Sequence, residues 1–200
     1  MATFNNPAGY LKIILGPMTS GKTTELIKEY NRHLAGGFNC CFINHSVDDR
    51  YGSGITTTST HNKSTVKNTF SCSKLDYLML DEENRISPYD VFFVNEGQFF
   101  PDLEFYINYL VNRKKKKVYV CGLDGDFKRE KFGTLLNIIP ICDDIIKLKA
   151  LCIQCKKSEA IFTFRLTNDQ EQTVVGGTES YCALCRNCYN NSFYQDKNCV

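Results

Sequence analysis

The sequence lacks an excess of charge of either sign, a long hydrophobic run and a secretory leader. Its 24 lysines and arginines nearly balance 22 acidic residues, so the formal charge is only +2 and no global basic field is available to hold nucleic acid or an anionic membrane. No apolar stretch approaches the roughly 20 residues needed to cross a bilayer. The first residues, MATFNNPAGY, have neither the basic flank nor the apolar core of a signal peptide. We therefore expect a cytoplasmic protein with no membrane or nucleic-acid partner.

Cysteine is abundant, with 11 in 200 residues, and it is unevenly distributed. The odd total, and a chain that is 42% hydrophobic and large enough to bury a core, favour metal binding over a disulfide framework. This unevenness predicts two parts, residues 1–149 and 150–200. The second part holds Cys152, Cys155, Cys182, Cys185, Cys188 and Cys199.

Short apolar runs alternate with helical patterns through the first part. Strands are predicted over 10–15, 40–44, 91–94, 118–121 and 145–148, and helices over 24–34, 75–83 and 101–112. Residues 48–70 are polar and predict a long loop, with room for a strand near its end. Continuous apolar strands interleaved with helices predict an α/β fold with a parallel sheet covered by helices on both faces.

The second part has a different pattern. Residues 160–166 and 171–175 predict a hairpin that turns around Asn168 and Asp169, and pairs of cysteines bracket it. A region of about 50 residues with so little core material usually needs a staple to hold its shape.

Residues 16–23 read GPMTSGKT and match the P-loop pattern G-x-x-x-x-G-K-[ST]. The glycines let backbone N–H groups point at phosphate oxygens, the lysine adds a cation, and the threonine offers a hydroxyl to Mg²⁺. A chance match in a glycine-rich turn is the alternative, but an apolar run precedes the motif and a helical pattern follows it. We therefore predict phosphate binding by Gly16, Pro17, Met18, Thr19, Ser20, Gly21, Lys22 and Thr23.

The predicted strand over 91–94 ends in Asn95, Glu96, Gly97 and Gln98. At such a strand end in a P-loop protein, a side chain faces the metal ion and the attacking nucleophile. Glu96 is suited to accept a proton from a hydroxyl group, and a solvated strand-end carboxylate is the alternative. We include all four residues in the predicted ATP site.

Two Cys-x-x-Cys pairs, Cys152 with Cys155 and Cys185 with Cys188, predict a zinc site. Four thiolates fill a tetrahedral site, so the ion would be structural. Cys182 shares the same spacing, which leaves open which two of the last three join the first pair; buried free thiols are the alternative.

The run RKKKK at 113–117 is compatible with nucleic-acid binding. It lies between a predicted helix and a predicted strand, where cations favour the helix C-terminus, and a solvated surface turn is the preferred interpretation.

Taken together, these segments resemble the thymidine kinases of the cellular and poxvirus type, also called type II. The similarity runs from about residue 11 to residue 189, with all segments in the same order. They are GPMTSGKTTEL, DDRYGSG, NEGQFFPDLEF, LDGDFKREKFG, LKALCIQC, VVGGTESY and CALCRNCY. The resemblance implies a P-loop NTPase-like domain at 1–149 and a small zinc-binding lasso domain, or lid domain, at 150–200.

The resemblance also implies a reaction, in which the γ-phosphate of ATP passes to the 5′-hydroxyl of thymidine. Glu96 matches the general base, and Lys22 with the P-loop amides would hold the phosphates. Asp48, Asp49 and Arg50 match a second phosphate-side element of the family. Arg165 matches a cation near the reacting phosphate.

In this family the nucleoside lies beneath the lasso. The residues that match its binding pocket are Met18, Leu123, Phe127, Phe132, Thr163, Val174, Val175, Gly176 and Tyr181. The ligands that match the zinc site are Cys152, Cys155, Cys185 and Cys188, and Cys182 is not among them. The resemblance further implies a homotetramer and feedback inhibition by thymidine triphosphate.

Three positions depart from the family pattern. Asn95 replaces the usual aspartate that, with Thr23, would hold Mg²⁺, so the affinity for that ion is in question. Thr19 replaces an aromatic residue, and Asp126 replaces a threonine before Phe127 and adds negative charge near the nucleoside pocket.

Two functions of other classes compete with a kinase. The first is a P-loop ATPase whose zinc module binds nucleic acid, against which the mixed charges of residues 152–188 argue. The second is a nucleotide sensor that lost its activity with the aspartate, against which Glu96 and Lys22 argue.

Overall fold

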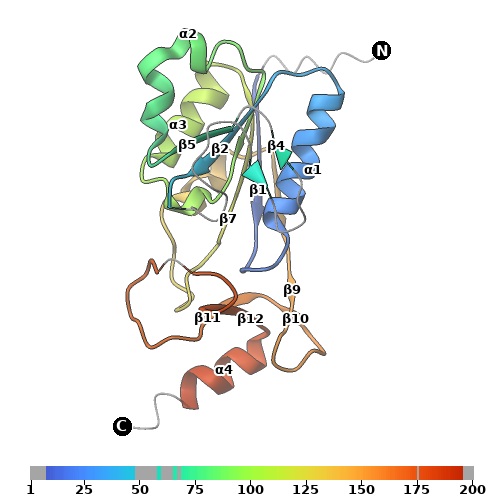
Figure 1. The fold of residues 1–200 in the computed structure, drawn as a ribbon, viewed down its shortest axis with the longest axis vertical. Coiled ribbons are helices and arrows are strands. Elements are labelled where there is room, and N and C mark those ends of the chain that lie inside the picture. The colour runs from blue at the N-terminus through green and yellow to red at the C-terminus, as the bar shows by residue number, and fades with distance from the viewer. Residues whose placement is uncertain (1–7, 48–57, 60–64, 67–68, 175, 196–200) are drawn as a thin grey trace.

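A computed structural model of the 200-residue chain describes residues 8–47, 58–59, 65–66, 69–174 and 176–195 (Figure 1). Six strands form one sheet, in the order β5-β2-β6-β7-β1-β8, and every neighbouring pair is parallel. The strands are β1 (Tyr10–Leu15), β2 (Cys40–His45), β5 (Thr69–Cys72), β6 (Val91–Val94), β7 (Lys117–Gly122) and β8 (Asp144–Lys147). The five strands predicted between residues 10 and 148 therefore form, and β5 is the additional one near the end of the predicted loop.

Both faces of the sheet are covered by helices: α1 (Lys22–Ala35), α2 (Glu82–Arg85) and α3 (Leu103–Asn108). Alternate residues of a strand point to opposite faces. In β6, Phe92 packs in one core cluster with Leu103, whereas Phe93 packs in a second cluster with Tyr30 of α1. Figure 1 shows α1 on one side of the sheet and α2 and α3 on the other. The predicted α/β fold is confirmed.

Two predicted helices differ from the expectation in their geometry. The segment at 75–83 begins as a 3₁₀ helix, η2 (Leu75–Asp81), and the one at 101–112 ends as a π-helical turn, η4 (Tyr109–Arg113). The Asp102 carboxylate accepts hydrogen bonds from the backbone N–H groups of Leu75 (3.1 Å) and Asp76 (3.0 Å). These first N–H groups of η2 are thus satisfied by a residue distant in sequence, which no local pattern indicates.

The remaining strands form short antiparallel pairs. Most of the predicted loop over 48–70 lies outside the described residues, but β3 (Thr58–Ser59) pairs with β4 (Thr65–Val66) within it. In the C-terminal part, β9 (Ala150–Leu151) pairs with β10 (Glu159–Ala160), and β11 (Phe162–Arg165) pairs with β12 (Tyr181–Leu184). The chain then forms helix α4 (Arg186–Gln195).

The predicted hairpin between 160–166 and 171–175 is wrong. β11 pairs instead with β12, and residues 166–180, here called the lasso, connect the two strands without forming a strand in their described portion. The physical reason lies at Arg165, whose guanidinium group donates hydrogen bonds to the carbonyl oxygens of Asp169, Glu171 and Gln172. Those carbonyl groups are then not available to a sheet ladder.

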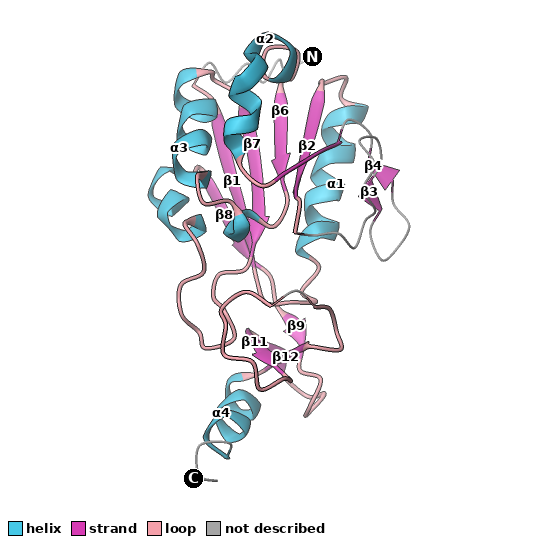
Figure 2. Cartoon of the chain, turned by 60° about the vertical axis from the view of Figure 1, so that its left-hand side comes forward, coloured by secondary structure: helices cyan, strands magenta, loops and turns pink. Residues whose placement is uncertain are grey.

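The carboxyl ends of the sheet strands point toward the C-terminal part (Figure 2). That part has its own small core, which includes Cys152, Leu184 and Tyr189, and the boundary near residue 149 stays a prediction. The backbone N–H of Met18 donates to Thr163 Oγ1 (3.0 Å) and joins the loop after β1 to β11. Ligands bind at this edge in open α/β sheets, so the candidate site lies here. Within the described ranges, no helix is both long enough and apolar enough to span a bilayer.

Candidate active site and zinc centre

The predicted P-loop, residues 16–23, leaves β1 at Leu15 as expected, and helix α1 begins at Lys22, two residues before the predicted start. Gly16 has a φ of 152°, and a Cβ atom there would lie 2.7 Å from the carbonyl oxygen of Leu148, so only glycine fits between the loop and the neighbouring chain. Gly21 occupies the helix N-cap with a left-handed φ of 85°. The Lys22 ammonium group donates to the Pro17 carbonyl (2.8 Å), which folds the side chain back over the loop. The positive end of α1 and a cation thus face the same small space.

Asn95 lies at the centre of a buried polar cluster. Its Oδ1 accepts hydrogen bonds from Thr23 Oγ1 (3.2 Å) and from Cys121 Sγ (3.0 Å), and its Nδ2 donates to Asn44 Oδ1 (3.1 Å). The structure therefore brings together the two residues, Thr23 and Asn95, that were predicted to hold Mg²⁺. Both offer a neutral oxygen, which suits this hard cation, but neither contributes charge.

Glu96 turns away from the sheet into the site. It has a left-handed backbone, with φ of 54° and ψ of 48°, and precedes the 3₁₀ turn η3 (Gly97–Phe99). A non-glycine residue in this region is uncommon and concentrates at functional sites. Gln98 is 3% exposed; its Nε2 donates to Glu96 Oε2 (2.6 Å) and its Oε1 accepts the N–H of Leu123 (3.0 Å). The carboxylate of Glu96 is thus held in one orientation. The alternative interpretation, a solvated carboxylate at a strand end, does not account for the hydrogen bond from Gln98.

A cavity of about 830 Å³ extends from the P-loop to the lasso. Lys22, Thr23 and Glu96 lie in its wall, which is therefore shared by the elements predicted to bind phosphate and the pocket predicted for the nucleoside. Its volume is in the range of pockets that enclose a small ligand. The predicted nucleoside-pocket residues that line it are Met18, Leu123, Phe127, Phe132, Thr163, Val174, Gly176 and Tyr181. Val175 and the predicted phosphate-side residues Asp48, Asp49 and Arg50 lie outside the described residues.

Two further cavity residues join the lasso to the loop after β7. Asp126 is 4% exposed; its Oδ1 accepts the N–H groups of Lys128 (2.8 Å) and Glu130 (2.9 Å), and its Oδ2 accepts Gln172 Nε2 (2.8 Å). The sequence indicates the turn, because an aspartate often bonds the backbone two residues later. Gln172 carries no comparable signal, and sequence reasoning missed it.

Arg165 does not line this cavity; it lies beneath the lasso, and its side chain is 5% exposed. Its NH1 donates to the carbonyl groups of Asp169 (2.9 Å) and Glu171, and its NH2 donates to the carbonyl of Gln172 (3.1 Å) and the hydroxyl of Tyr181 (2.7 Å). The predicted contact with a phosphate group stays a prediction.

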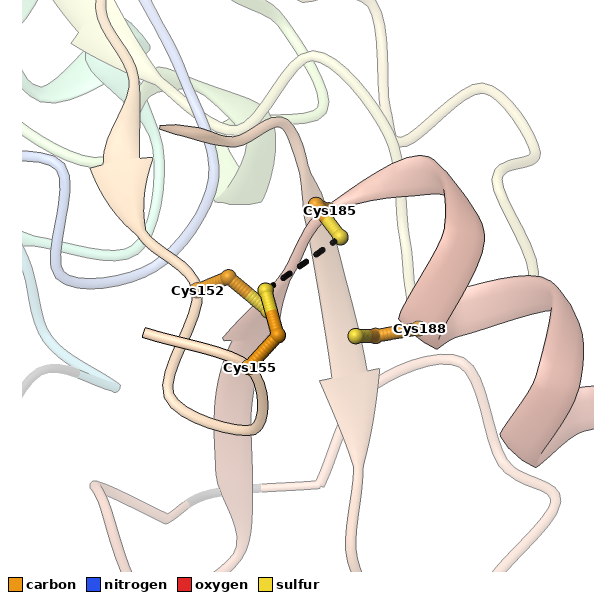
Figure 3. Close-up of side chains that lie close together, drawn as sticks. All are labelled: Cys152, Cys155, Cys185 and Cys188. Atoms are coloured by element: carbon orange, nitrogen blue, oxygen red, sulfur yellow. Dashed lines mark hydrogen bonds between the residues drawn. The ribbon is translucent and has the colours of Figure 1, made fainter. Parts of the chain in front are cut away.

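Four cysteine sulfurs gather between β9, β12 and α4, and all lie within 4.8 Å of one another (Figure 3). They belong to Cys152, Cys155, Cys185 and Cys188, and the Sγ atoms of Cys155 and Cys185 are 3.9 Å apart. A tetrahedron with Zn–S bonds of about 2.3 Å has sulfurs about 3.8 Å apart, so the cluster has the size of a Cys₄ zinc site. The ambiguity over Cys182 is thereby removed, since it is not in the cluster.

The thiols of this cluster are suited to metal binding. Burial opposes ionisation of Cys152, but hydrogen bonds from the backbone of Cys155, Cys185 and Gln154 outweigh it and lower the pKa to about 6. The pKa of Cys155 is also lowered, chiefly by a backbone hydrogen bond from Lys157. Burial, followed by the neighbouring sulfurs, raises the pKa of Cys188 to about 12, so this residue needs a cation beside it to bind as a thiolate. All ten described cysteines are free of disulfides.

The basic run at 113–117 is occupied by structural contacts. Lys114 pairs with Glu82, Lys116 Nζ donates to the carbonyl of Tyr89 (2.6 Å), and Lys117 Nζ lies 4.8 Å from the centre of the Phe38 ring. These contacts favour the surface-turn interpretation over a nucleic-acid interface.

Comparison with known proteins decides the family. The sequence profile described as "Thymidine kinase" matches residues 9–189. The chain belongs to the thymidine kinase family. It is 38% identical to the thymidine kinase of Raccoon poxvirus over 183 residues, which cover 92% of this chain and 98% of the relative. It is 40% identical to that of Yaba monkey tumor virus over 185 residues, covering 92% and 97%, and 38% identical to that of Vaccinia virus (strain Western Reserve) over 184 residues, covering 92% and 98%. The protein is therefore a kinase, and the cavity at the carboxyl edge of its sheet is its candidate active site.

Proposed function

We propose that this kinase transfers the γ-phosphate of ATP to the 5′-hydroxyl of thymidine, giving thymidine monophosphate and ADP. The observation that carries the proposal is the placement of Glu96, whose carboxylate lines one cavity together with the P-loop lysine and the predicted nucleoside pocket. A base that activates a hydroxyl for attack on ATP must lie between these two elements.

Glu96 is the general base in this proposal. Its carboxylate takes the proton of the 5′-hydroxyl as the 5′-oxygen attacks the γ-phosphorus, and the bond to the β–γ bridging oxygen breaks. Gln98 holds the carboxylate through the 2.6 Å hydrogen bond and is itself held by the N–H of Leu123. This support fixes the direction of the base before substrate arrives, which favours a near-attack geometry.

The phosphates of ATP bind the P-loop at residues 16–23, with Lys22 as the cation. Its ammonium group now donates to the Pro17 carbonyl, a neutral acceptor, and an anionic phosphate oxygen would be a stronger partner for the same cation. Mg²⁺ would be held by Thr23 and Asn95, and it supplies neutralisation of the charge on the transferred phosphate. Asp48, Asp49 and Arg50 are proposed as a second phosphate-side element on the family pattern.

The nucleoside occupies the end of the cavity nearest the lasso. Phe127 and Phe132 offer aromatic surfaces to a flat base, and Met18, Leu123, Thr163 and Tyr181 complete the wall. We propose that backbone groups of Val174 and Gly176, within the lasso, match the edge of thymine; the hydroxyl of Tyr181 donates to the carbonyl of Val174 (2.8 Å) and holds the backbone there. A closed lasso also excludes water, so the γ-phosphate is not lost to hydrolysis.

The remaining features of the family are proposed for this chain as well. Cys152, Cys155, Cys185 and Cys188 would hold Zn²⁺, which would be structural and would stabilise the base of the lasso. Thymidine triphosphate would occupy the nucleoside pocket and inhibit the enzyme, a homotetramer is the assembly, and the cytoplasm is the compartment.

The test is transfer of label from γ-labelled ATP with Mg²⁺ to each deoxynucleoside in turn. Label in thymidine monophosphate supports the proposal. Release of free phosphate that DNA stimulates would instead support a nucleic-acid-dependent ATPase, and tight ATP binding without turnover would support a nucleotide sensor.

A further inference from the structure

The guanidinium group of Arg165 is bound to the lasso and to Tyr181, the first residue of β12. Four hydrogen bonds run from its two terminal nitrogens to Asp169, Glu171, Gln172 and Tyr181. These use all four terminal N–H groups, and of the N–H groups of this guanidinium only Nε–H has no partner among the described residues. The lasso is therefore wrapped around this side chain.

We infer that Arg165 is a positioning residue that sets the conformation of the lasso, and that it acts on nucleoside binding through the groups it holds. It does not touch the reacting phosphate. The inference rests on the proposed function, because it assigns the lasso to the nucleoside side of the reaction.

A relay of hydrogen bonds leads from Arg165 to the pocket. Tyr181 accepts a hydrogen bond from Arg165 NH2 and donates its own hydroxyl proton to the carbonyl of Val174 (2.8 Å). Both Tyr181 and Val174 line the cavity. Loss of the guanidinium group thus releases the backbone at Val174, where we propose that the base is recognised.

The plane of the guanidinium group is also fixed. Its central carbon lies 3.7 Å from the centre of the Phe127 ring, so the group packs against that cavity residue, and NH2 donates to the hydroxyl of Tyr181, whose ring centre is 5.1 Å away. The carbonyl of Phe127 in turn accepts a hydrogen bond from the hydroxyl of Tyr189 (2.5 Å), which follows the zinc ligand Cys188. Arg165 therefore links the zinc-braced helix α4, the ring that faces the base, and the lasso.

A cation at this place is not sufficient for such a role. The carbonyl groups of three lasso residues and one hydroxyl are held by a planar fork, whereas a lysine ammonium group is a point charge with three donors and no stacking surface. Positioning therefore needs arginine itself. A contact with phosphate depends mainly on charge, which lysine would preserve in part.

The experiment compares Arg165→Lys and Arg165→Gln with the unmodified protein, and uses Arg113→Gln, a change at an exposed site, as the matched control. Thymidine affinity and ATP affinity are measured by calorimetry, together with kcat at saturating thymidine. A glutamate-specific protease reports on the lasso directly, because Glu171 and Glu179 are the cleavage sites within it.

We expect both Arg165 variants to bind thymidine at least 10-fold more weakly, with ATP affinity unchanged and faster cleavage after Glu171, and R165K to be no better than R165Q. Tyr181→Phe, a smaller change, should weaken thymidine binding in the same direction.

If R165K keeps thymidine affinity and lasso protection while kcat falls, Arg165 acts on phosphate and the inference is overturned. If both variants fail to fold, protection of the lasso in Y181F decides, and unchanged protection overturns the inference. A wild-type protein that phosphorylates no thymidine refutes the proposed function instead, while the protease comparison still tests the positioning role.

Discussion

At the scale of single residues, Asn95 and Glu96 show how one strand end produces two environments. Asn95 continues β6 inward, is fully buried and has partners on both sides of its amide. Glu96 reverses direction through its positive φ and enters the cavity. The sequence pattern predicts that this strand end carries the chemistry, but the backbone reversal depends on packing beyond it. The support from Gln98 is likewise a tertiary contact, because its other partner is Leu123 after a different strand.

The departure at Asn95 gives a prediction on metal binding. Asn95→Asp adds a negative charge 3.2 Å from the hydroxyl of Thr23, so the concentration of Mg²⁺ at half-maximal activity should fall several-fold. The amide of Asn44 can rotate to donate to the new carboxylate. Mn²⁺ binding followed by electron paramagnetic resonance provides a readout independent of turnover. Identical metal titrations for both proteins would show that another acid, such as Asp48 or Asp49, already supplies the charge.

At the scale of elements, a helix or strand could be predicted where the interactions that form it are local in sequence. The six-residue strand β1 and helix α1 follow local apolar periodicity and were predicted closely. The lasso was predicted as a hairpin, since its sequence has strand-like residues around a good turn, but Arg165 and Asp126 bind its polar groups from outside. Contacts between residues 40 or more positions apart leave no local pattern. The hydrogen bond between Gln172 and Asp126, here called the clasp, could therefore not be predicted.

The clasp between Asp126 and Gln172 gives a prediction on lasso closure. Gln172→Glu places a carboxylate against a buried carboxylate, and repulsion between them should raise the KM for thymidine by about 10-fold while kcat changes less. The double variant Asp126→Asn with Gln172→Glu restores a donor–acceptor pair and should recover most of the loss. Equal KM values for Gln172→Glu and the unmodified protein would show that the clasp does not hold the lasso during binding.

At the scale of the whole molecule, the sheet gathers distant segments at one edge and buries a polar network on the α1 face. His33 is 7% exposed; its Nδ1 is bonded to the carbonyl of Glu29 (2.9 Å) and its Nε2 lies 3.3 Å from the hydroxyl of Tyr119. These partners fit a neutral imidazole that donates from Nδ1 and accepts at Nε2. Burial is the main cause that lowers the pKa of His33, and the positive charges of Arg32 and Lys117 lower it further. The hydrogen bond to the carbonyl of Glu29 acts in the opposite direction but does not outweigh them.

The lowered pKa of His33 predicts how stability depends on pH. The unfolded chain binds a proton near pH 6.5, whereas the folded protein does not until lower pH, so stability should fall as the pH drops below about 6.5. His33→Gln removes this contribution and should give a shallower decline between pH 7.5 and 5.5. Free energies of unfolding from urea titrations at the two pH values test the difference. Parallel declines in the variant and the unmodified protein would exclude His33 as the cause.

The central claim is that Glu96 removes the proton from the hydroxyl group of the acceptor at the edge where P-loop and lasso meet. Single-turnover phosphoryl transfer, measured by rapid quench with ATP and thymidine for the unmodified protein and for Glu96→Gln, tests it most directly. The account predicts that the rate falls by about 10²–10⁴ in the variant, with thymidine affinity nearly unchanged, because a general base contributes to the transition state and an amide cannot accept the proton. A rate within a few-fold of the unmodified protein would contradict it.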